Sequence, residues 1–189
     1  PPPSSPPTPP SPPPPLPPPA QILKLWGDAI DDGNEGNRIV SMSANGSIVA
    51  IGMPSSNNNE GKARVYANYD NTWAKLGGDI IAFNGENFES IGRAVALSGN
   101  GFTVAIGAQS DGLAYESYSS YGMDQSSNGC GEVNVYTYSG TTWGRIGQTI
   151  YGEFKENAGA AVSLNDDGRI VAIGVPDDAD EHPLVRVYN

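Results

Sequence analysis

Cysteine and histidine are almost absent from this chain, and their scarcity excludes several kinds of site. Cys130 is the only cysteine and His182 the only histidine among 189 residues. A single thiol cannot form an internal disulfide, so Cys130 is either a buried free thiol or a link to another chain. A histidine-type zinc site needs several nitrogen or sulfur ligands. A serine–histidine–carboxylate relay would need His182, which stands beside Pro183 in an acidic stretch without a nucleophile-elbow pattern.

Positive charge and long apolar runs are also scarce. The chain has 10 basic and 21 acidic side chains and a formal net charge of −11, which argues against binding nucleic acid or an anionic membrane. It contains no apolar run of about 18 residues, the length that a membrane-spanning helix requires, so no membrane insertion is expected. Carboxylates are numerous, but none stands in the distinctive context of a glycosidase pair, and no phosphate-binding glycine loop occurs. The sequence therefore predicts a protein that is not an enzyme.

Proline is concentrated at one end of the chain and nearly missing from the rest. Fourteen of the 17 prolines lie between residues 1 and 19. Because such runs have fixed φ and lack backbone donors, residues 1–20 are predicted to form an extended polyproline II arm. The arm is similar in composition to the hydroxyproline-rich wall glycoproteins of algae and plants. Its hydroxyl side chains are candidate sites for O-linked sugars: Ser4, Ser5, Thr8 and Ser11.

The remaining residues, 21–189, contain one segment in three similar copies. The copies read SMSANGSIVAIGMP at 41–54, ALSGNGFTVAIGA at 96–108 and SLNDDGRIVAIGVP at 163–176. In each copy, two short stretches rich in Val, Ile and Ala flank a turn whose glycine can supply the positive φ of a tight hairpin. Repetition at a constant phase indicates supersecondary units that stack to share a core.

Each copy continues with further strand signals. A strand ending in tyrosine follows at 63–66, 133–136 and 185–188, and the first two copies add an aromatic strand with a glycine break at 73–80 and 143–150. The apolar run Ile48–Ile51 fits a strand covered on both faces. No window shows convincing helical periodicity. We therefore predict an all-β fold of three four-stranded antiparallel units, the pattern of a propeller blade.

The third copy reaches Asn189 without an aromatic strand, and a segment near the other end echoes the missing part. Residues 24–28 (KLWGD) resemble residues 75–79 (KLGGD), although Ile22 stands where the other copies have tryptophan. The predicted units are therefore about 31–80, 81–150 and 151–189, the last completed by strand 22–30 of the same chain or of a neighbour. Three units are too few to close around an axis, so we expect an open array.

The order of these motifs resembles a known family. The pattern AVSLNDDGRIVAIGVP, then VRVY, then W-x-x-x-G-x-x-I resembles the FG-GAP type of β-propeller repeat, found in integrin α-chain heads and in many extracellular proteins of algae and microbes; the resemblance covers about residues 22–189. It implies an extracellular location and rings of about seven blades. Family repeats often carry a calcium loop of alternating acidic or amide residues. Here the candidate ligands lack that spacing, with solvated acidic loops as the alternative: Asn57, Asn59, Asp177, Asp178 and Asp180.

Two further features are candidates for contacts or modification. The second copy carries an insertion at 109–131 that contains Cys130 and the tyrosines Tyr115, Tyr118 and Tyr121. Loops of this length are usually functional or disordered, and tyrosine supplies contact area at low entropic cost, so the insertion is a candidate partner loop. A surface loop without a partner is the alternative. Asn45-Gly46-Ser47 is a candidate acceptor for an N-linked sugar.

These observations favour a structural protein that polymerises with itself outside the cell, as a filament or wall layer. The leading segment of one copy (Ile22, Leu23, Lys24, Leu25, Trp26) would complete the third unit of the next, at Val185, Val187 and Tyr188. The alternative is an adhesion module that binds wall glycans or another surface protein, with calcium as the candidate ion and no other cofactor. In a third interpretation the residues belong to a longer propeller, and segment 22–30 belongs to a preceding blade.

Overall fold

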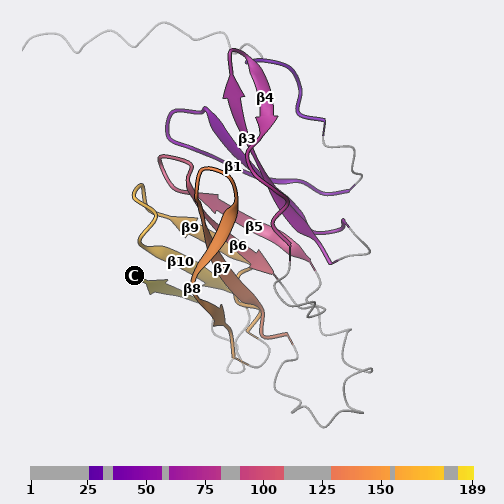
Figure 1. Ribbon diagram of the computed structural model, residues 1–189. Coiled ribbons are helices and arrows are strands. Elements are labelled where there is room, and N and C mark those ends of the chain that lie inside the picture. The colour runs from indigo at the N-terminus through magenta and orange to yellow at the C-terminus, as the bar shows by residue number, and fades with distance from the viewer. Residues whose placement is uncertain are drawn as a thin grey trace, which may run out of the picture.

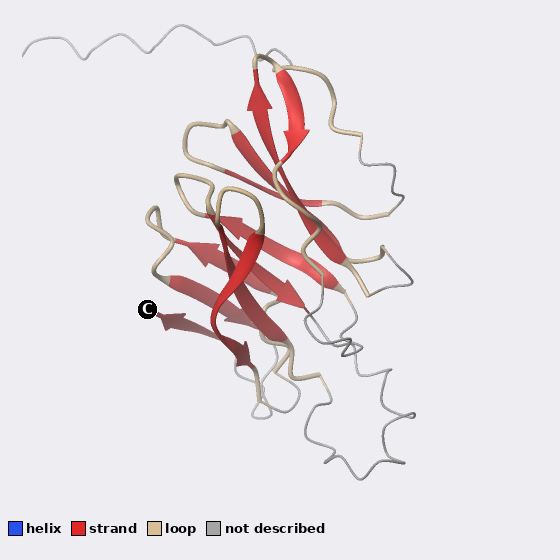
Figure 2. Cartoon of the chain, viewed as in Figure 1, coloured by secondary structure: helices blue, strands red, loops and turns tan. Residues whose placement is uncertain are grey.

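The computed structural model describes residues 26–31, 36–56, 60–81, 90–108, 129–153, 156–176 and 183–189. Within these ranges all regular elements are β-strands, and all strands of a sheet pair antiparallel (Figure 2). The described residues include no helix that could cross a membrane. The prediction of an all-β fold is confirmed.

The strands form three sheets. Sheet 1 contains β1 (Ile39–Met42), β2 (Ile48–Met53), β3 (Lys62–Tyr69) and β4 (Thr72–Lys75), in that spatial order. Sheet 2 contains β5 (Ile91–Leu97), β6 (Thr103–Ala108), β7 (Glu132–Tyr138) and β8 (Trp143–Tyr151), again in chain order. Sheet 3 has three strands, β9 (Ala161–Leu164), β10 (Val171–Val175) and β11 (Leu184–Tyr188). The sheets follow one another in chain order as an unclosed array, as predicted (Figure 1).

The same hairpin opens each sheet. In sheet 1 the N–H of Ser43 donates to the carbonyl of Ile48 at 2.9 Å, and equivalent bonds close the turns of sheets 2 and 3. The turn glycine Gly46 has a φ of 76°, and its counterparts Gly101 and Gly168 have φ values of 77° and 72°. A side chain at this φ would be strained, which explains why each copy of the repeat has glycine here.

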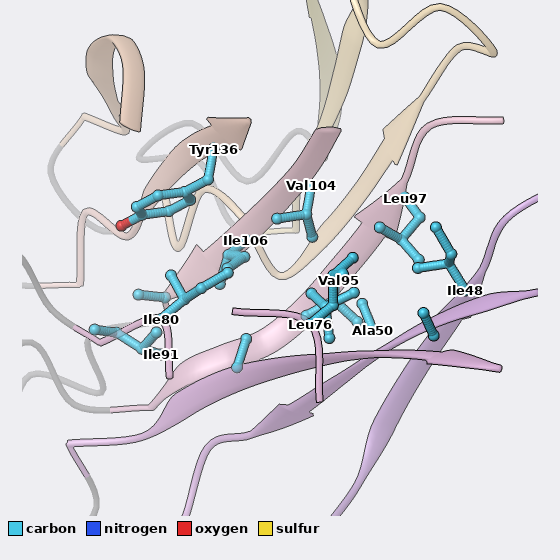
Figure 3. Packing of buried hydrophobic residues seen from close by; sticks show 14 residues of the cluster. Ile48, Ala50, Leu76, Ile80, Ile91, Val95, Leu97, Val104, Ile106 and Tyr136 are labelled. Carbon is cyan, nitrogen blue, oxygen red and sulfur yellow. The ribbon is translucent and has the colours of Figure 1, made fainter. Parts of the chain in front are cut away.

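Two apolar layers join the three sheets. The layer between sheets 1 and 2 includes Ile48 and Ala50 from β2 and Val95 and Leu97 from β5 (Figure 3). Between sheets 2 and 3, the layer is formed by Ala105, Val133, Ala158, Val171, Ile173 and Val175. Since all residues of β2 are buried, the prediction that Ile48–Ile51 is covered on both faces is also confirmed.

Neighbouring sheets approach most closely where glycines face each other. A Cβ atom on Gly52 would lie 2.0 Å from the carbonyl oxygen of Gly92, and one on Gly107 would lie 2.1 Å from that of Gly159. Real Cβ atoms do not make such contacts, so only glycine allows the backbones to come this close. Backbone hydrogen bonds between hairpin turns also join neighbouring sheets. The N–H of Ala44 in sheet 1 donates to Gly99 O in sheet 2, and the N–H of Gly99 donates to Asp166 O in sheet 3, both at 2.9 Å.

Candidate functional site

The outward face of sheet 3 is an apolar surface that neither of the other two described sheets covers. Cα partners place Ala172 beside Ser163 and Val187, and Gly174 beside Ala161 and Val185, all on the face opposite the core with sheet 2. Ile170 precedes β10 at the end of this face and is 42% exposed. We call this surface the open face of sheet 3, formed by Ala161, Ser163, Ile170, Ala172, Gly174, Val185 and Val187.

The open face corresponds to the faces by which sheets 1 and 2 pack on the next sheet. Val185 and Val187 stand in the repeat where β3 has Ala63 and Val65. Ala63 and Val65 are completely buried against sheet 2, whereas Val185 and Val187 are 68% and 65% exposed. The open face therefore has the apolar residues that form contacts between sheets elsewhere in the molecule, but no described sheet packs on it.

The opposite end of the array has a matching open surface, on β1. Val40 and Met42 share a face with Ile51 and Val49 of β2, away from sheet 2. They are 66% and 60% exposed, whereas the corresponding residues of β5, Val95 and Leu97, are each 7% exposed beneath sheet 1. Each end of the array thus presents one half of the contact that joins its internal sheets.

Sheet 3 also differs from the other two sheets at its edge. In sheets 1 and 2, β3 and β7 each pair with a fourth strand, but β11 is the edge strand of sheet 3. An edge strand presents a row of backbone donors and acceptors that can pair with another strand. Val185, Val187 and Tyr188, the predicted acceptor residues, all lie on this strand.

Residues 26–31 lie against the outer hairpin of sheet 1 and form no strand. The indole N–H of Trp73 donates to the carbonyl of Trp26 at 3.1 Å, and the indole N–H of Trp26 donates to Asn71 Oδ1 at 2.9 Å. The two indole rings meet edge to face, with centroids 6.4 Å apart. Ile30 packs on the buried group of Val49, Ile51, Met53 and Tyr66. In this structure, then, the described part of the predicted strand 22–30 is not a strand, and it covers the outer part of sheet 1.

Trp26 contacts sheet 1 in the same way that Leu76, which follows β4 of sheet 1, contacts sheet 2. There the indole N–H of Trp143 donates to the carbonyl of Leu76 at 2.7 Å, as Trp73 does to Trp26. Trp26 therefore corresponds to Leu76, and Gly27 to Gly77. The sequence comparison had aligned Trp26 with Gly77, one residue away, because it matched Lys24 and Asp28 rather than the glycine; that alignment is wrong by one position.

The charges on the sheets are paired. Arg64 donates from Nε to Asp79 Oδ1 at 2.8 Å, and Lys75 lies 2.7 Å from the same oxygen. The Arg64 hydrogen bond, reinforced by Lys75 and opposed by burial, holds the pKa of Asp79 well below its usual range. In sheet 3, Arg186 takes the repeat position of Arg64 and donates to both carboxylate oxygens of Glu156 at 2.5 Å.

These ion pairs leave the open face of sheet 3 uncharged. Glu156 is 4% exposed, and the Arg186 hydrogen bonds lower its pKa against the effect of burial. Arg186 lies on the opposite side of β11 from Val185 and Val187. The site therefore offers apolar contact and backbone hydrogen bonding. Among the described residues, no group of three or more His, Cys, Asp and Glu side chains could hold a metal ion.

The other predicted site residues are only partly described. Cys130 is half-buried, and its carbonyl accepts a hydrogen bond from the N–H of Ala158 at 2.8 Å, at the step between sheets 2 and 3. The exposed Asn45 has its Oδ1 held by the N–H and hydroxyl of Ser47 and by the hydroxyl of Ser43. The remaining candidates lie outside the described residues: Ser4, Ser5, Thr8, Ser11, Ile22, Leu23, Lys24, Leu25, Asn57, Asn59, Tyr115, Tyr118, Tyr121, Asp177, Asp178 and Asp180.

Sequence reasoning missed most of the residues on the two open surfaces. It named Val185 and Val187 but not Ile170, Ala172 or the β1 pair Val40 and Met42. The signal was available in the period of the strands, because alternate residues of a strand lie on opposite faces. When the three copies are aligned, each of these residues falls at a position whose counterpart in another copy is buried between two sheets.

Comparison with protein-family models found no match, and comparison with curated proteins found none. Among solved structures, the chain is similar to hydrazine synthase of Kuenenia stuttgartiensis, with 12% identity and a TM-score of 0.48 over 72% of this chain and 36% of that one. It is also similar to TolB of Acinetobacter baumannii, with 12% identity and a TM-score of 0.42 over 79% of this chain and 29% of that one. A third similar structure is the β-propeller domain of Cps50 (Swd1) from Myceliophteria thermophila, with 14% identity and a TM-score of 0.41 over 80% of this chain and 40% of that one.

The chain spans between 29% and 40% of the length of these three solved chains. Identity at this level transfers neither activity nor partners. The blade-like arrangement rests on the sheets themselves: consecutive antiparallel sheets in chain order, packed face to face through repeated glycine and apolar contacts.

Proposed function

We propose that the protein is a non-enzymatic structural subunit that assembles head to tail with copies of itself into an extracellular filament or surface layer. The observation that carries the proposal is that one chain has two different, complementary exposed surfaces, one at each end of the array of sheets. Sheet 3 presents an uncovered apolar face and an edge strand, and sheet 1 presents the complementary surface with residues 26–30 upon it. A copy that donates its leading segment to β11 of another copy would satisfy both ends by strand addition.

The geometry of the contact favours extension over a symmetric dimer. The two surfaces are different, so the contact is heterologous, and such contacts produce either closed rings or open fibres. Blade arrays curve around an axis, and two copies joined by an unchanged contact would offer six blades, enough to close a ring. A fibre therefore requires that the joint differ from the internal contacts. Asn37 stands in the repeat where Gly92 and Gly159 allow the sheets to meet, so the proposed joint would not come as close at this corner.

The extracellular location is supported by sequence features alone. The repeat resembles FG-GAP repeats of extracellular proteins, and the proline-rich arm resembles the glycosylated tracts of wall proteins. In the proposed assembly, the arm would be a stiff spacer or a strut along neighbouring subunits, and Ser4, Ser5, Thr8 and Ser11 would carry O-linked sugars.

A truncation pair tests this function. Deleting residues 1–30 removes both the arm and the Trp26–Ile30 segment, whereas deleting residues 1–20 removes the arm alone. We expect negative-stain microscopy and sedimentation velocity to show fibres for the full chain and for the shorter deletion, and none for the deletion of 1–30. Circular dichroism of the longer deletion checks that its sheets still form, since Ile30 contributes to the core of sheet 1.

Two outcomes would contradict the proposal. Fibres of normal morphology after deletion of 1–30 would show that the segment is not required, and closed two-copy rings would show that the subunit does not build a filament. The second candidate function, adhesion through the 109–131 loop, predicts instead a monodisperse monomer that binds a wall polysaccharide and loses that binding when calcium is chelated.

A further inference from the structure

We infer that the fourth strand of sheet 3 is supplied by residues 26–30 of a second copy, in one defined register: Trp26 opposite Val187 and Ile30 opposite Val185. The inference rests on the proposed function and adds the partner surface and the paired residues. Its evidence is a bulge that occurs in both complete sheets, together with a glycine of the leading segment that has the same positive φ as the bulge glycines.

In both complete sheets the fourth strand meets the third through the same bulge. In sheet 2, Val135 pairs with Ile146 and Val133 with Ile150, so four residues of the fourth strand span two residues of the third. In sheet 1, the N–H of Leu76 donates to Val65 O at 2.7 Å, and two residues back along β3, Ala63 exchanges hydrogen bonds with Ile80 at 2.8 and 2.9 Å. A bulge of this kind bends the strand and is commonly built on a glycine with positive φ.

The leading segment shares the sequence pattern of the bulge and the positive φ of its glycine. The bulge glycines Gly77 and Gly147 have φ values of 77° and 69°, and each is preceded by an apolar residue and followed three residues later by isoleucine. Trp26-Gly27-Asp28-Ala29-Ile30 has this sequence pattern, and Gly27 has a φ of 80° although the segment is paired to no sheet. Gly27 therefore already has the backbone conformation that the bulge requires, which reduces the conformational entropy that pairing would cost at this residue.

The segment already occupies the correct position on sheet 1 for this pairing. Trp73 donates to the carbonyl of Trp26 as Trp143 donates to the carbonyl of Leu76. Sheet 1 therefore contacts the leading segment in the way that sheet 2 contacts the end of sheet 1. Among the described residues no third strand lies beside the segment, and in the inferred assembly β11 of another copy takes that place. Val40 and Met42 of the first copy then receive the open face of sheet 3 from the second.

The charge pairing fits the inferred register. In sheet 1 the fourth strand provides Asp79, which neutralises Arg64. In the inferred joint the residue at that position is Ala29, which carries no charge. Arg186, in the place of Arg64, has its carboxylate partner Glu156 within its own copy, so the joint leaves no buried guanidinium without a counter-ion.

Trp26 has a second contact that the joint would alter. A Cβ on the turn glycine Gly101 would lie 2.7 Å from Ile48 of sheet 1, and one on Gly168 would lie 2.8 Å from Thr103 of sheet 2. At the corresponding Gly46, a Cβ would lie 3.3 Å from the ring of Trp26, which stands where Ile170 of the second copy would lie. The half-exposed Trp26 ring therefore shields this turn in the free subunit and moves when Ile170 docks.

A disulfide between two single-cysteine variants tests the register. The hydrogen-bonded pair Ala63–Ile80 has the geometry in which Cα atoms are about 5.5 Å apart, within the range that a disulfide spans. In a Cys130→Ser background, full-length Ile30→Cys and Val185→Cys subunits are mixed under mild oxidation. We expect a cross-linked dimer on a non-reducing gel. The matched control mixes Ala29→Cys with Val185→Cys; residue 29 neighbours residue 30 but faces the other side of a strand, so cross-linking should fall at least tenfold.

The outcomes separate this inference from the proposed function. Equal cross-linking of the Ala29→Cys and Ile30→Cys subunits, or none in variants that still form fibres, would overturn the register and leave the filament. Cross-linking at Ile30 in closed two-copy rings would support the register while overturning the filament. A chain that stays monomeric at all concentrations, without cross-links, would overturn both. Tryptophan fluorescence of the unaltered chain should change on assembly by more than that of a Trp26→Phe variant, and an equal change in the two would contradict docking of Ile170.

Discussion

Strands β3 and β11 carry the same motif in opposite surroundings. Val65 in β3 is completely buried by sheet 2, and Val187 in β11 is 65% exposed, although both occupy the same place in the repeat. The difference lies in whether a further sheet covers the strand, because the local backbone pairing to the preceding strand is the same. The comparison shows that a repeat motif specifies a face, and the neighbouring unit decides whether that face becomes core.

The strongest test of this comparison is a charged residue on each strand. Val65→Asp places an unpaired carboxylate between sheets 1 and 2 and should lower the free energy of unfolding by more than about 4 kcal/mol. Val187→Asp lies on the open face and should change the stability of the monomer by less than about 0.5 kcal/mol. Urea unfolding of both variants at a concentration that keeps the protein monomeric measures the two values. Comparable losses would mean that sheet 3 is covered in solution.

The second test adds one methyl group at equivalent glycines. In Gly52→Ala the new Cβ would lie 2.0 Å from a backbone oxygen of sheet 2, whereas in Gly174→Ala the nearest atom is Ala161 Cβ at 3.2 Å. Backbone must move in the first case, at a cost of about 1–3 kcal/mol, and little movement is needed in the second. Thermal melts of the monomeric variants should therefore show a clear loss for Gly52→Ala only. If Gly174→Ala lost as much, sheet 3 would have a neighbour at its open face.

The smallest effect concerns pH and compares the ion pairs of sheets 1 and 3. Hydrogen bonds from Arg64 and from Arg186 lower the pKa of Asp79 and of Glu156 below the values of the unfolded chain. Their contribution to stability is therefore complete above about pH 4.3 and is lost as the pH falls through the lowered pKa values. Since Arg64, Asp79 and Arg186 are partly accessible to water although Glu156 is buried, each pair should contribute roughly 1 kcal/mol. Unfolding at pH 6 and pH 2.5 should differ less in Asp79→Asn and in Glu156→Gln than in the natural chain, and an unchanged difference would contradict these roles.

The repeat made much of this fold accessible from sequence. Short stretches of Val, Ile and Ala flanking a glycine turn specify a hairpin by local physics. The copies at 41–54, 96–108 and 163–176 therefore predicted the positions of the hairpins β1–β2, β5–β6 and β9–β10. The uninterrupted apolar run of β2, which is buried on both faces, is likewise a local signal. The prediction of three stacked antiparallel units followed from repetition, because a single unit cannot bury its own apolar faces.

The candidate site was less accessible, for reasons that involve contacts between distant residues. The role of Trp26 depends on the indole of Trp73, 47 positions later, and no local pattern encodes that hydrogen bond. The echo of the fourth strand was found, but its register was wrong by one residue because matching charges outweighed the bulge glycine. The exposure of Val185 and Val187 could not be read from their sequence, since identical positions elsewhere in the repeat are buried.

The bonds between the hairpin turns have a consequence for the direction of growth. Each bond runs from the amide of an earlier turn to the carbonyl of a later one, from Ala44 to Gly99 and from Gly99 to Asp166. In a joint made by the same bond, the donor at one end of a subunit meets the acceptor at the opposite end of the next. Any chain of these subunits is consequently vectorial: it has a plus and a minus end, and anything that recognises a terminus can distinguish where such a polymer starts from where it stops.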